Sequence, residues 1–134
     1  MILLRLAFRF TRRLYPKLIQ SILKSHRPNS AVSGLAHITG GGLKDNIERL
    51  LPEKCKLKLD RSAWPVPPEF TWLQRLGGID RDEMYHVFNM GIGFTLIVRP
   101  QFAQSIRRQL TAAGTDHWTI GEIKSGQRGV DYAS

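Results

Sequence analysis

The residues of this chain that could do chemistry gather around three consecutive glycines, Gly40, Gly41 and Gly42. They stand between an apolar stretch, "GLAHIT", and a segment with helical spacing, "LKDNIERLL". Glycine loses more backbone freedom on folding than any other residue, so three in a row need a compensating role. A glycine loop at the start of a helix exposes backbone N–H groups that phosphate or carboxylate can approach closely. We therefore interpret the triplet as a candidate anion-binding loop, and a simple tight turn is the alternative.

Three polar side chains flank this loop. His37 lies two residues before Thr39 on the stretch that leads into the glycines, so its imidazole is a candidate catalytic group beside a bound ligand. The structural alternative for His37 is a half-buried, hydrogen-bonded histidine. Asn46 and Arg49 lie three residues apart on the expected first helical turns, where each either reaches the anion or covers the surface.

The glycine triplet matches neither of the two common nucleotide loops. No Lys-Ser/Thr pair follows it at the spacing of an ATP-binding loop, and it is not the G-x-G-x-x-G dinucleotide fingerprint. If the triplet binds a phosphate, we expect Gly41→Ala to weaken that binding, because the added methyl group blocks the anion.

A second glycine set, "FNMGIG", supplies Asn89, Gly91 and Gly93 as further candidate ligand-binding residues. Glycines in an apolar run mark a bulge or a place where a ligand or another backbone comes close. The structural alternative is that these glycines pack against a neighbouring helix. The single cysteine, Cys55, excludes an internal disulfide and a cysteine-rich metal site, and we assign no metal ligands. One cysteine also fits a reducing compartment.

Length and composition predict one globular domain. The chain has 134 residues, of which 42% are hydrophobic and 23% charged. Its net charge of +9 is concentrated near the N-terminus, because residues 1–44 contain eight basic residues and no acid. The remainder is nearly balanced, so the composition does not predict a nucleic-acid-binding surface.

Residues 1–12, "MILLRLAFRFTR", are basic and apolar, and we interpret them as an N-terminal extension that is non-native or disordered. Arg5 and Arg9 interrupt the apolar core that a targeting peptide needs, and no small-residue cleavage site follows. The stretch is too short to span a membrane. We expect residues 13–134 to form the domain.

Apolar spacing in that domain predicts alternating helices and strands. Leu43, Ile47, Leu50 and Leu51 fall on one helical stripe that Pro52 ends, and "GFTLIV" is typical of a strand buried on both faces. Asp80 is a candidate helix N-cap. Helices are expected over 13–26, 43–51, 69–78, 80–88 and 101–113, and strands over 32–39, 55–59, 91–99 and 117–123, with a turn at 27–30. This order predicts an α+β fold with a layered, mixed β-sheet.

Several stretches together resemble aminoimidazole ribonucleotide synthetase, the phosphoribosylformylglycinamidine cyclo-ligase of purine biosynthesis. They are "GLAHITGGGLKDNIERLLP", "DRSAWPVPPEF", "LQRLGGIDRDEMYHVFNMGIGF" and the closing "IGEI". Their order and spacing favour this family over selenophosphate synthetase or thiamine-phosphate kinase. The chain departs from the family at Thr11-Arg12, where Pro-Thr is usual, and at Glu48, where proline is common.

The resemblance implies an enzyme that uses ATP and Mg²⁺ to close the imidazole ring of formylglycinamidine ribonucleotide. It also implies a homodimer in the cytoplasm, with no nucleic-acid or membrane partner. The family's N-terminal, ATP-binding half has no counterpart here, so we expect a C-terminal portion that is inactive without a separate N-terminal half. The alternative is a stand-alone phosphate-ligand-binding module without catalysis.

Overall fold

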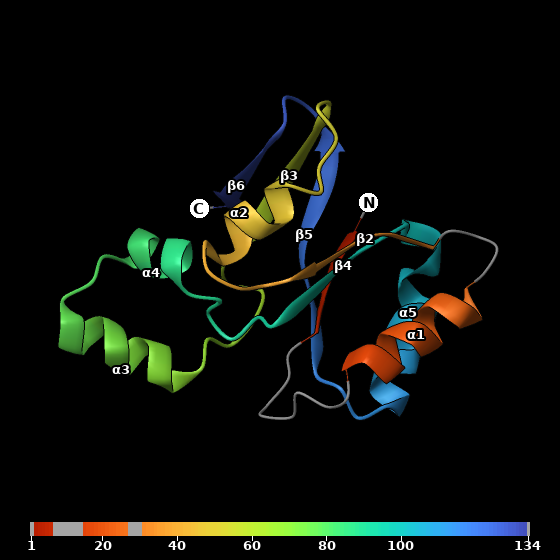
Figure 1. Ribbon diagram of the computed structural model, residues 1–134, viewed down its shortest axis with the longest axis horizontal. Helices are drawn as coiled ribbons and strands as arrows, with labels where there is room; N and C mark the ends of the chain where they lie inside the picture. The colour runs from red at the N-terminus through yellow and green to blue at the C-terminus, as the bar shows by residue number, and fades with distance from the viewer. Residues whose placement is uncertain (1, 7–14, 27–30, 134) are drawn as a thin grey trace.

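The computed structural model describes residues 2–6, 15–26 and 31–133, which form a layered α+β fold around one six-stranded sheet (Figure 1). The strands are β1 Ile2–Leu6, β2 Val32–His37, β3 Cys55–Asp60, β4 Phe94–Val98, β5 His117–Ser125 and β6 Gly129–Ala133. The helices are α1 Tyr15–Ser25, α2 Gly42–Glu48, α3 Pro68–Gly77, α4 Arg81–Val87 and α5 Pro100–Ala112. The expected fold class is confirmed.

The sheet is mixed and has the strand order β2-β4-β1-β5-β3-β6. All neighbouring strands are antiparallel except β3 and β6, which run parallel. Strand β2, which leads into the glycine triplet, is therefore one edge of the sheet, and β6 is the other. None of the helices in the described ranges is long and apolar enough to cross a membrane.

Two hydrophobic cores lie on opposite faces of the sheet. In one, α1 and α5 bury Ile22, Ile106 and Leu110 against β4. In the other, α2 buries Leu43 and Ile47 against β3 and α4. Each fully buried Leu or Ile contributes about 1.5–3 kcal/mol, so these contacts position α2 firmly on its face of the sheet.

Strand β4 belongs to both cores, as expected for a strand covered on two faces. Leu96 and Val98 lie in the core below α1 and α5, whereas Ile97 lies in the core that includes α2. This alternation follows from the two-residue period of a strand. The strand begins at Phe94 rather than at the expected residue 91, because the residues before it form a turn.

The expected element order lacked the first and last strands. We placed residues 1–12 outside the domain, but β1 lies in the middle of the sheet, where its backbone pairs with β4 and β5. Strand β6 follows β5 and pairs in parallel with β3. Both errors concern five-residue strands whose partners are distant in the sequence. The turn predicted at 27–30 and residues 1 and 7–12 of the extension lie outside the described residues.

The ends of α3 and α4 follow local capping rules, whereas α2 ends earlier than expected. Gly78 has the left-handed conformation of a C-cap after α3, and the Asp80 carboxylate accepts a hydrogen bond from the Asp82 N–H at 2.9 Å, which confirms the N-cap of α4. Helix α2 ends at Glu48, before the expected stop at Pro52. Leu50 consequently lies off the buried stripe, with 39% of its surface exposed.

The loop between β3 and α3 is held in place by Trp64. Its indole is buried and donates a hydrogen bond from Nε1 to the Met90 carbonyl at 3.1 Å. Met90 belongs to the turn that contains the second glycine set. Trp64 thus links two segments that are far apart in the sequence and positions the turn before β4.

We expect Trp64→Phe to lower the free energy of unfolding by about 1–3 kcal/mol, because it removes a buried donor from the Met90 carbonyl. The matched control is Trp72→Phe on the exposed side of α3, where the change should stay within about 0.5 kcal/mol. Urea denaturation measures both. Equal effects of the two substitutions would contradict the role assigned to the indole.

Candidate functional site

The glycine triplet forms the connection between β2 and α2, as expected. Gly41 and Gly42 have φ angles of 91° and 61°, in the left-handed region that favours glycine. A Cβ on Gly42 would lie 2.2 Å from the Tyr85 carbonyl oxygen, so glycine is required for α2 to approach α4 this closely. A Cβ on Gly40 would have no neighbour within 4 Å. The triplet is therefore a tight packing turn at Gly42 and an open loop at Gly40.

Asn46 holds the backbone of this loop. Its Nδ2 donates hydrogen bonds to the carbonyl oxygens of Gly42 at 2.7 Å, Gly40 at 3.2 Å and Thr39 at 3.3 Å. The Thr39 hydroxyl donates to Asn46 Oδ1 at 3.4 Å. The side chain that we expected to reach an anion is thus engaged with the loop itself and acts as a positioning residue.

These hydrogen bonds fix the direction in which the loop presents its N–H groups. In a planar trans peptide the C=O and N–H point in opposite directions, so the three peptide units bound by Asn46 turn their N–H groups away from it. These N–H groups belong to Gly40, Gly41 and Leu43. Within the described residues, neither Gly40 nor Gly41 donates its N–H to another group, and no side chain caps α2.

One negative charge lies beside the loop. A Cβ on Gly41 would lie 2.9 Å from the Asp45 carboxylate oxygen Oδ2. This carboxylate opposes an anion at Gly41, so the open side of the loop at Gly40 is the favourable approach. The left-handed φ of Gly41 also shows that the expected test, Gly41→Ala, would strain the backbone.

His37 and Arg49 occupy different ends of this region. His37 is exposed, not half-buried, and its ring stacks on the Phe94 ring with 6.3 Å between centroids and an angle of 28°. It lies at the end of β2, next to the loop. Arg49 is the C-cap of α2, at the opposite end of the helix from the glycines. Arg49 thus follows the second and last turn of α2, because the helix begins at Gly42 and spans only seven residues.

The second glycine set forms a tight turn beside the end of β2. Asn89 Oδ1 accepts a hydrogen bond from the Gly91 N–H at 2.9 Å, and Met90 and Gly91 both have positive φ angles, 50° and 85°. The Gly93 carbonyl accepts from the Ile38 N–H at 2.9 Å. The fold thus brings this turn to the residue that follows His37, while the Asn89 side chain shapes the turn.

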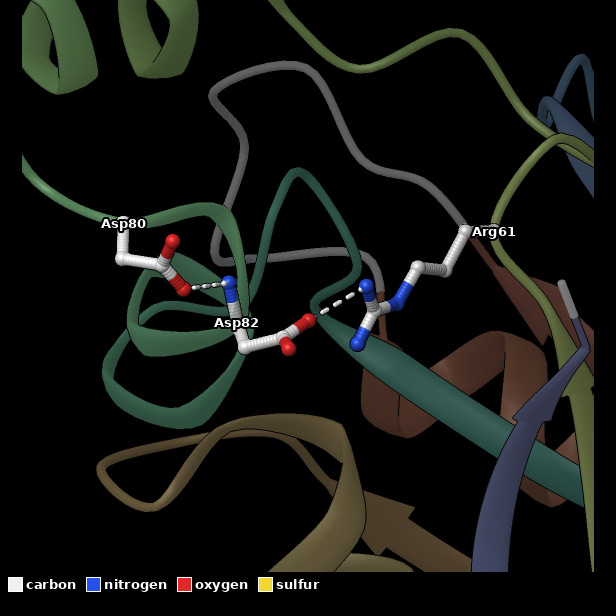
Figure 2. A network of polar contacts seen from close by, with 3 residues as sticks. All are labelled: Arg61, Asp80 and Asp82. Atoms are coloured by element: carbon white, nitrogen blue, oxygen red, sulfur yellow. Dashed lines mark hydrogen bonds and ion pairs between the residues drawn. The ribbon is translucent and has the colours of Figure 1, made fainter.

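Arg61 is a functional candidate that our sequence analysis did not select. Its guanidinium carbon lies 3.9 Å from the centroid of the Tyr132 ring and 4.6 Å from that of the Tyr85 ring. Its Nη1 pairs with the Asp82 carboxylate at 2.6 Å, and Asp80 accepts from the Asp82 N–H (Figure 2). Because the Asp82 side chain is 76% exposed, this ion pair adds little stability, and the two rings provide most of the fixed orientation.

This cluster contains two buried polar atoms, Arg61 Nε and the Tyr132 hydroxyl, without a hydrogen-bond partner in the described part of the chain. Burial raises the pKa of Tyr132, and Arg61 opposes that shift. The hydroxyl therefore stays neutral at physiological pH. Tyr85 connects the cluster to the glycine loop, because its ring contacts Arg61 and its carbonyl lies against Gly42. No local sequence signal marks Arg61, since its two rings come from distant segments.

Comparison with known proteins assigns a family to this architecture. The family model described as "AIR synthase related protein, C-terminal domain" matches residues 11–133. The phosphoribosylformylglycinamidine cyclo-ligase of Desulfitobacterium hafniense is 48% identical over 120 residues, which cover 90% of this chain and 34% of the relative. The cyclo-ligase of Pseudothermotoga lettingae is 46% identical over 102 residues, which cover 76% of this chain and 30% of the relative. The chain thus spans about a third of the length of these curated relatives.

Solved structures share the fold. The crystal structure of E. coli HypE, a hydrogenase maturation protein, aligns with a TM-score of 0.63 and 25% identity over 88% of this chain and 35% of that one. Thiamine-monophosphate kinase from Stenotrophomonas maltophilia aligns with a TM-score of 0.56 and 13% identity over 79% of this chain and 33% of that one. At 13% identity the second match supports the fold alone.

We expect Gly42→Ala to lower the free energy of unfolding by at least about 2 kcal/mol, since it combines a left-handed φ with a clash against the Tyr85 carbonyl. Gly40→Ala is the matched control, because nothing lies near its Cβ, and it should change stability by less than about 1 kcal/mol. Denaturant titration compares the two. A Gly42→Ala protein as stable as the control would refute the close packing of α2 on α4.

We expect Tyr132→Phe to leave the free energy of unfolding unchanged or slightly raised, because the hydroxyl that it removes has no partner among the described residues. Tyr132→Leu, which also removes the ring beneath Arg61, should lower stability by about 1 kcal/mol or more. Thermal melting of both variants decides. A large loss in Tyr132→Phe would show that the hydroxyl is hydrogen-bonded.

Proposed function

Because this chain belongs to the family of AIR synthase related proteins, as their C-terminal domain, we propose that it forms the C-terminal part of a phosphoribosylformylglycinamidine cyclo-ligase. That enzyme closes the imidazole ring of formylglycinamidine ribonucleotide, at the expense of ATP, to form aminoimidazole ribonucleotide in purine biosynthesis. The observation that carries this proposal is 48% identity to a curated cyclo-ligase over 90% of the chain. As further parts of this proposal, the enzyme is a homodimer and is located in the cytoplasm.

Within this function, we propose that the glycine loop binds a phosphate group of the substrate or nucleotide. The N–H groups of Gly40 and Gly41, turned away from Asn46, support this assignment, whereas Leu43 is fully buried. Helix α2 has only two turns, so these N–H groups contribute more than a helix dipole does. Preorganised donors of this kind stabilise the charge that develops during phosphoryl transfer without any covalent nucleophile.

His37 and the turn at 89–93 complete the proposed site. The exposed imidazole of His37 at the end of β2 is suited to donate or accept a proton beside a ligand on the loop. The Gly93 carbonyl joins the turn to Ile38 at the same strand end, and Asn89 holds the turn through the Gly91 N–H. Arg49 is not part of this proposal, because it lies at the far end of α2.

The proposal requires ATP with Mg²⁺, which supplies the phosphoryl group. In the described ranges, no group of three or more His, Cys, Asp or Glu side chains could hold a metal ion. We derive no step through the metal. We propose that the ATP site lies in the N-terminal two thirds of the cyclo-ligase length that this chain does not span.

Co-expression of this chain with the N-terminal two thirds of the Desulfitobacterium hafniense cyclo-ligase tests the assignment. We expect ADP formation that depends on formylglycinamidine ribonucleotide in the mixture and not with either piece alone. Binding of formylglycinamidine ribonucleotide without turnover would favour the alternative, a phosphate-ligand-binding module.

We expect Gly40→Ala to weaken binding of formylglycinamidine ribonucleotide more than tenfold, or at least about 1.4 kcal/mol, because its methyl group occupies the open side of the loop. Calorimetric titration of the folded variant measures this effect, and its melting curve serves as the stability control. Leu50→Ala, at an exposed position beyond α2, should bind like the unmodified chain. Unaltered affinity for formylglycinamidine ribonucleotide in a well-folded Gly40→Ala protein would contradict the anion-loop assignment.

A further inference from the structure

Helix α3 presents two large apolar side chains to solvent. None of its residues is buried, and Trp72 and Leu76 are 64% and 70% exposed. Their four-residue spacing places both side chains on one face of the helix. In Figure 1, α3 projects beyond α4, away from α1 and α5. We call the surface formed by Trp72 and Leu76 the α3 outer face.

The inner side of α3 attaches the helix to the domain, and the α3 outer face takes little part in that attachment. Phe70 packs against the hydrophobic core and against the Phe88 ring at 6.1 Å between centroids, and Leu73 is half-buried. An isolated ten-residue helix is marginal in water, so α3 depends on such contacts. Trp72 and Leu76 contribute little to them. Exposed large apolar side chains grouped on one face are typical of a protein-binding surface.

The α3 outer face lies next to the elements that build the candidate site. Gly78 and Asp80 join α3 directly to α4, and α4 packs on α2. In that packing, the Tyr85 carbonyl occupies the space that a Cβ on Gly42 would need. A partner on the α3 outer face would therefore sit beside the helices that position the glycine loop.

We propose that the α3 outer face docks the N-terminal portion of a cyclo-ligase, with the Trp72 indole as the central contact. This identification of the partner rests on the proposed function. The curated relatives are about three times as long as the matched region, so a domain of this kind has a polypeptide partner of known class. Tryptophan at the centre of an interface commonly contributes a large share of the binding energy.

The test uses the full chain, tagged and co-expressed with the N-terminal two thirds of the Desulfitobacterium hafniense cyclo-ligase. We expect a one-to-one complex in sedimentation velocity and a Kd raised more than tenfold by Trp72→Ala, with a further rise on adding Leu76→Ser. Both side chains are exposed, so melting curves of the variants should match that of the unmodified chain. Leu50→Ser, which removes an exposed leucine elsewhere, is the control and should bind normally.

Failure of this inference is distinguishable from failure of the proposed function. Docking that depends on Trp72 without any turnover would support the interface while contradicting the reaction. Restored turnover that Trp72→Ala leaves unchanged would support the reaction and overturn the interface. No complex with the unmodified chain, or self-association that Trp72→Ala abolishes, would overturn the proposed docking, and the latter would assign the face to a second copy.

Discussion

The close approach of Gly42 to the backbone of α4 is the constraint on which the candidate site depends. The Tyr85 carbonyl occupies the space that a side chain at Gly42 would need, so α2 can lie against α4 only with glycine there. That contact sets the position of the loop before α2. It also places the Tyr85 ring where it covers the Arg61 guanidinium. One backbone contact thus couples the loop, the cationic cluster and, through α4, the exposed helix α3.

Asn46 fixes the direction in which the N–H groups of this loop point. The Asn46 amide has two N–H donors for three loop carbonyls, of which Gly42 is the nearest at 2.7 Å, and a hydrogen bond is worth about 0.5–1.5 kcal/mol net, so the loop is held without any ligand. The donors that face away from Asn46 are consequently in place before an anion arrives. Preorganisation of this kind is what an oxyanion or phosphate site requires, because no donor has to reorient during the reaction.

The molecule has two helical layers of different character. The layer of α1 and α5 buries Ile22, Ile106 and Leu110 and contains no acidic residue. The layer of α2, α3 and α4 contains the glycine loop, the Arg61 cluster and the exposed Trp72. These three features therefore lie on one side of the sheet, whereas the His37 ring stacks on Phe94, which packs against the core of α1 and α5.

Sequence alone determined the features that depend on neighbouring residues. The α+β class, the Asp80 and Gly78 caps, the doubly buried β4 and the glycine loop all follow from local spacing and backbone preference. Only the tertiary structure decided which segments meet. It placed β1 in the centre of the sheet and Arg61 against two tyrosine rings. The physical reason is that strand pairing and ring stacking join residues separated by much of the chain, and no local pattern records such partners.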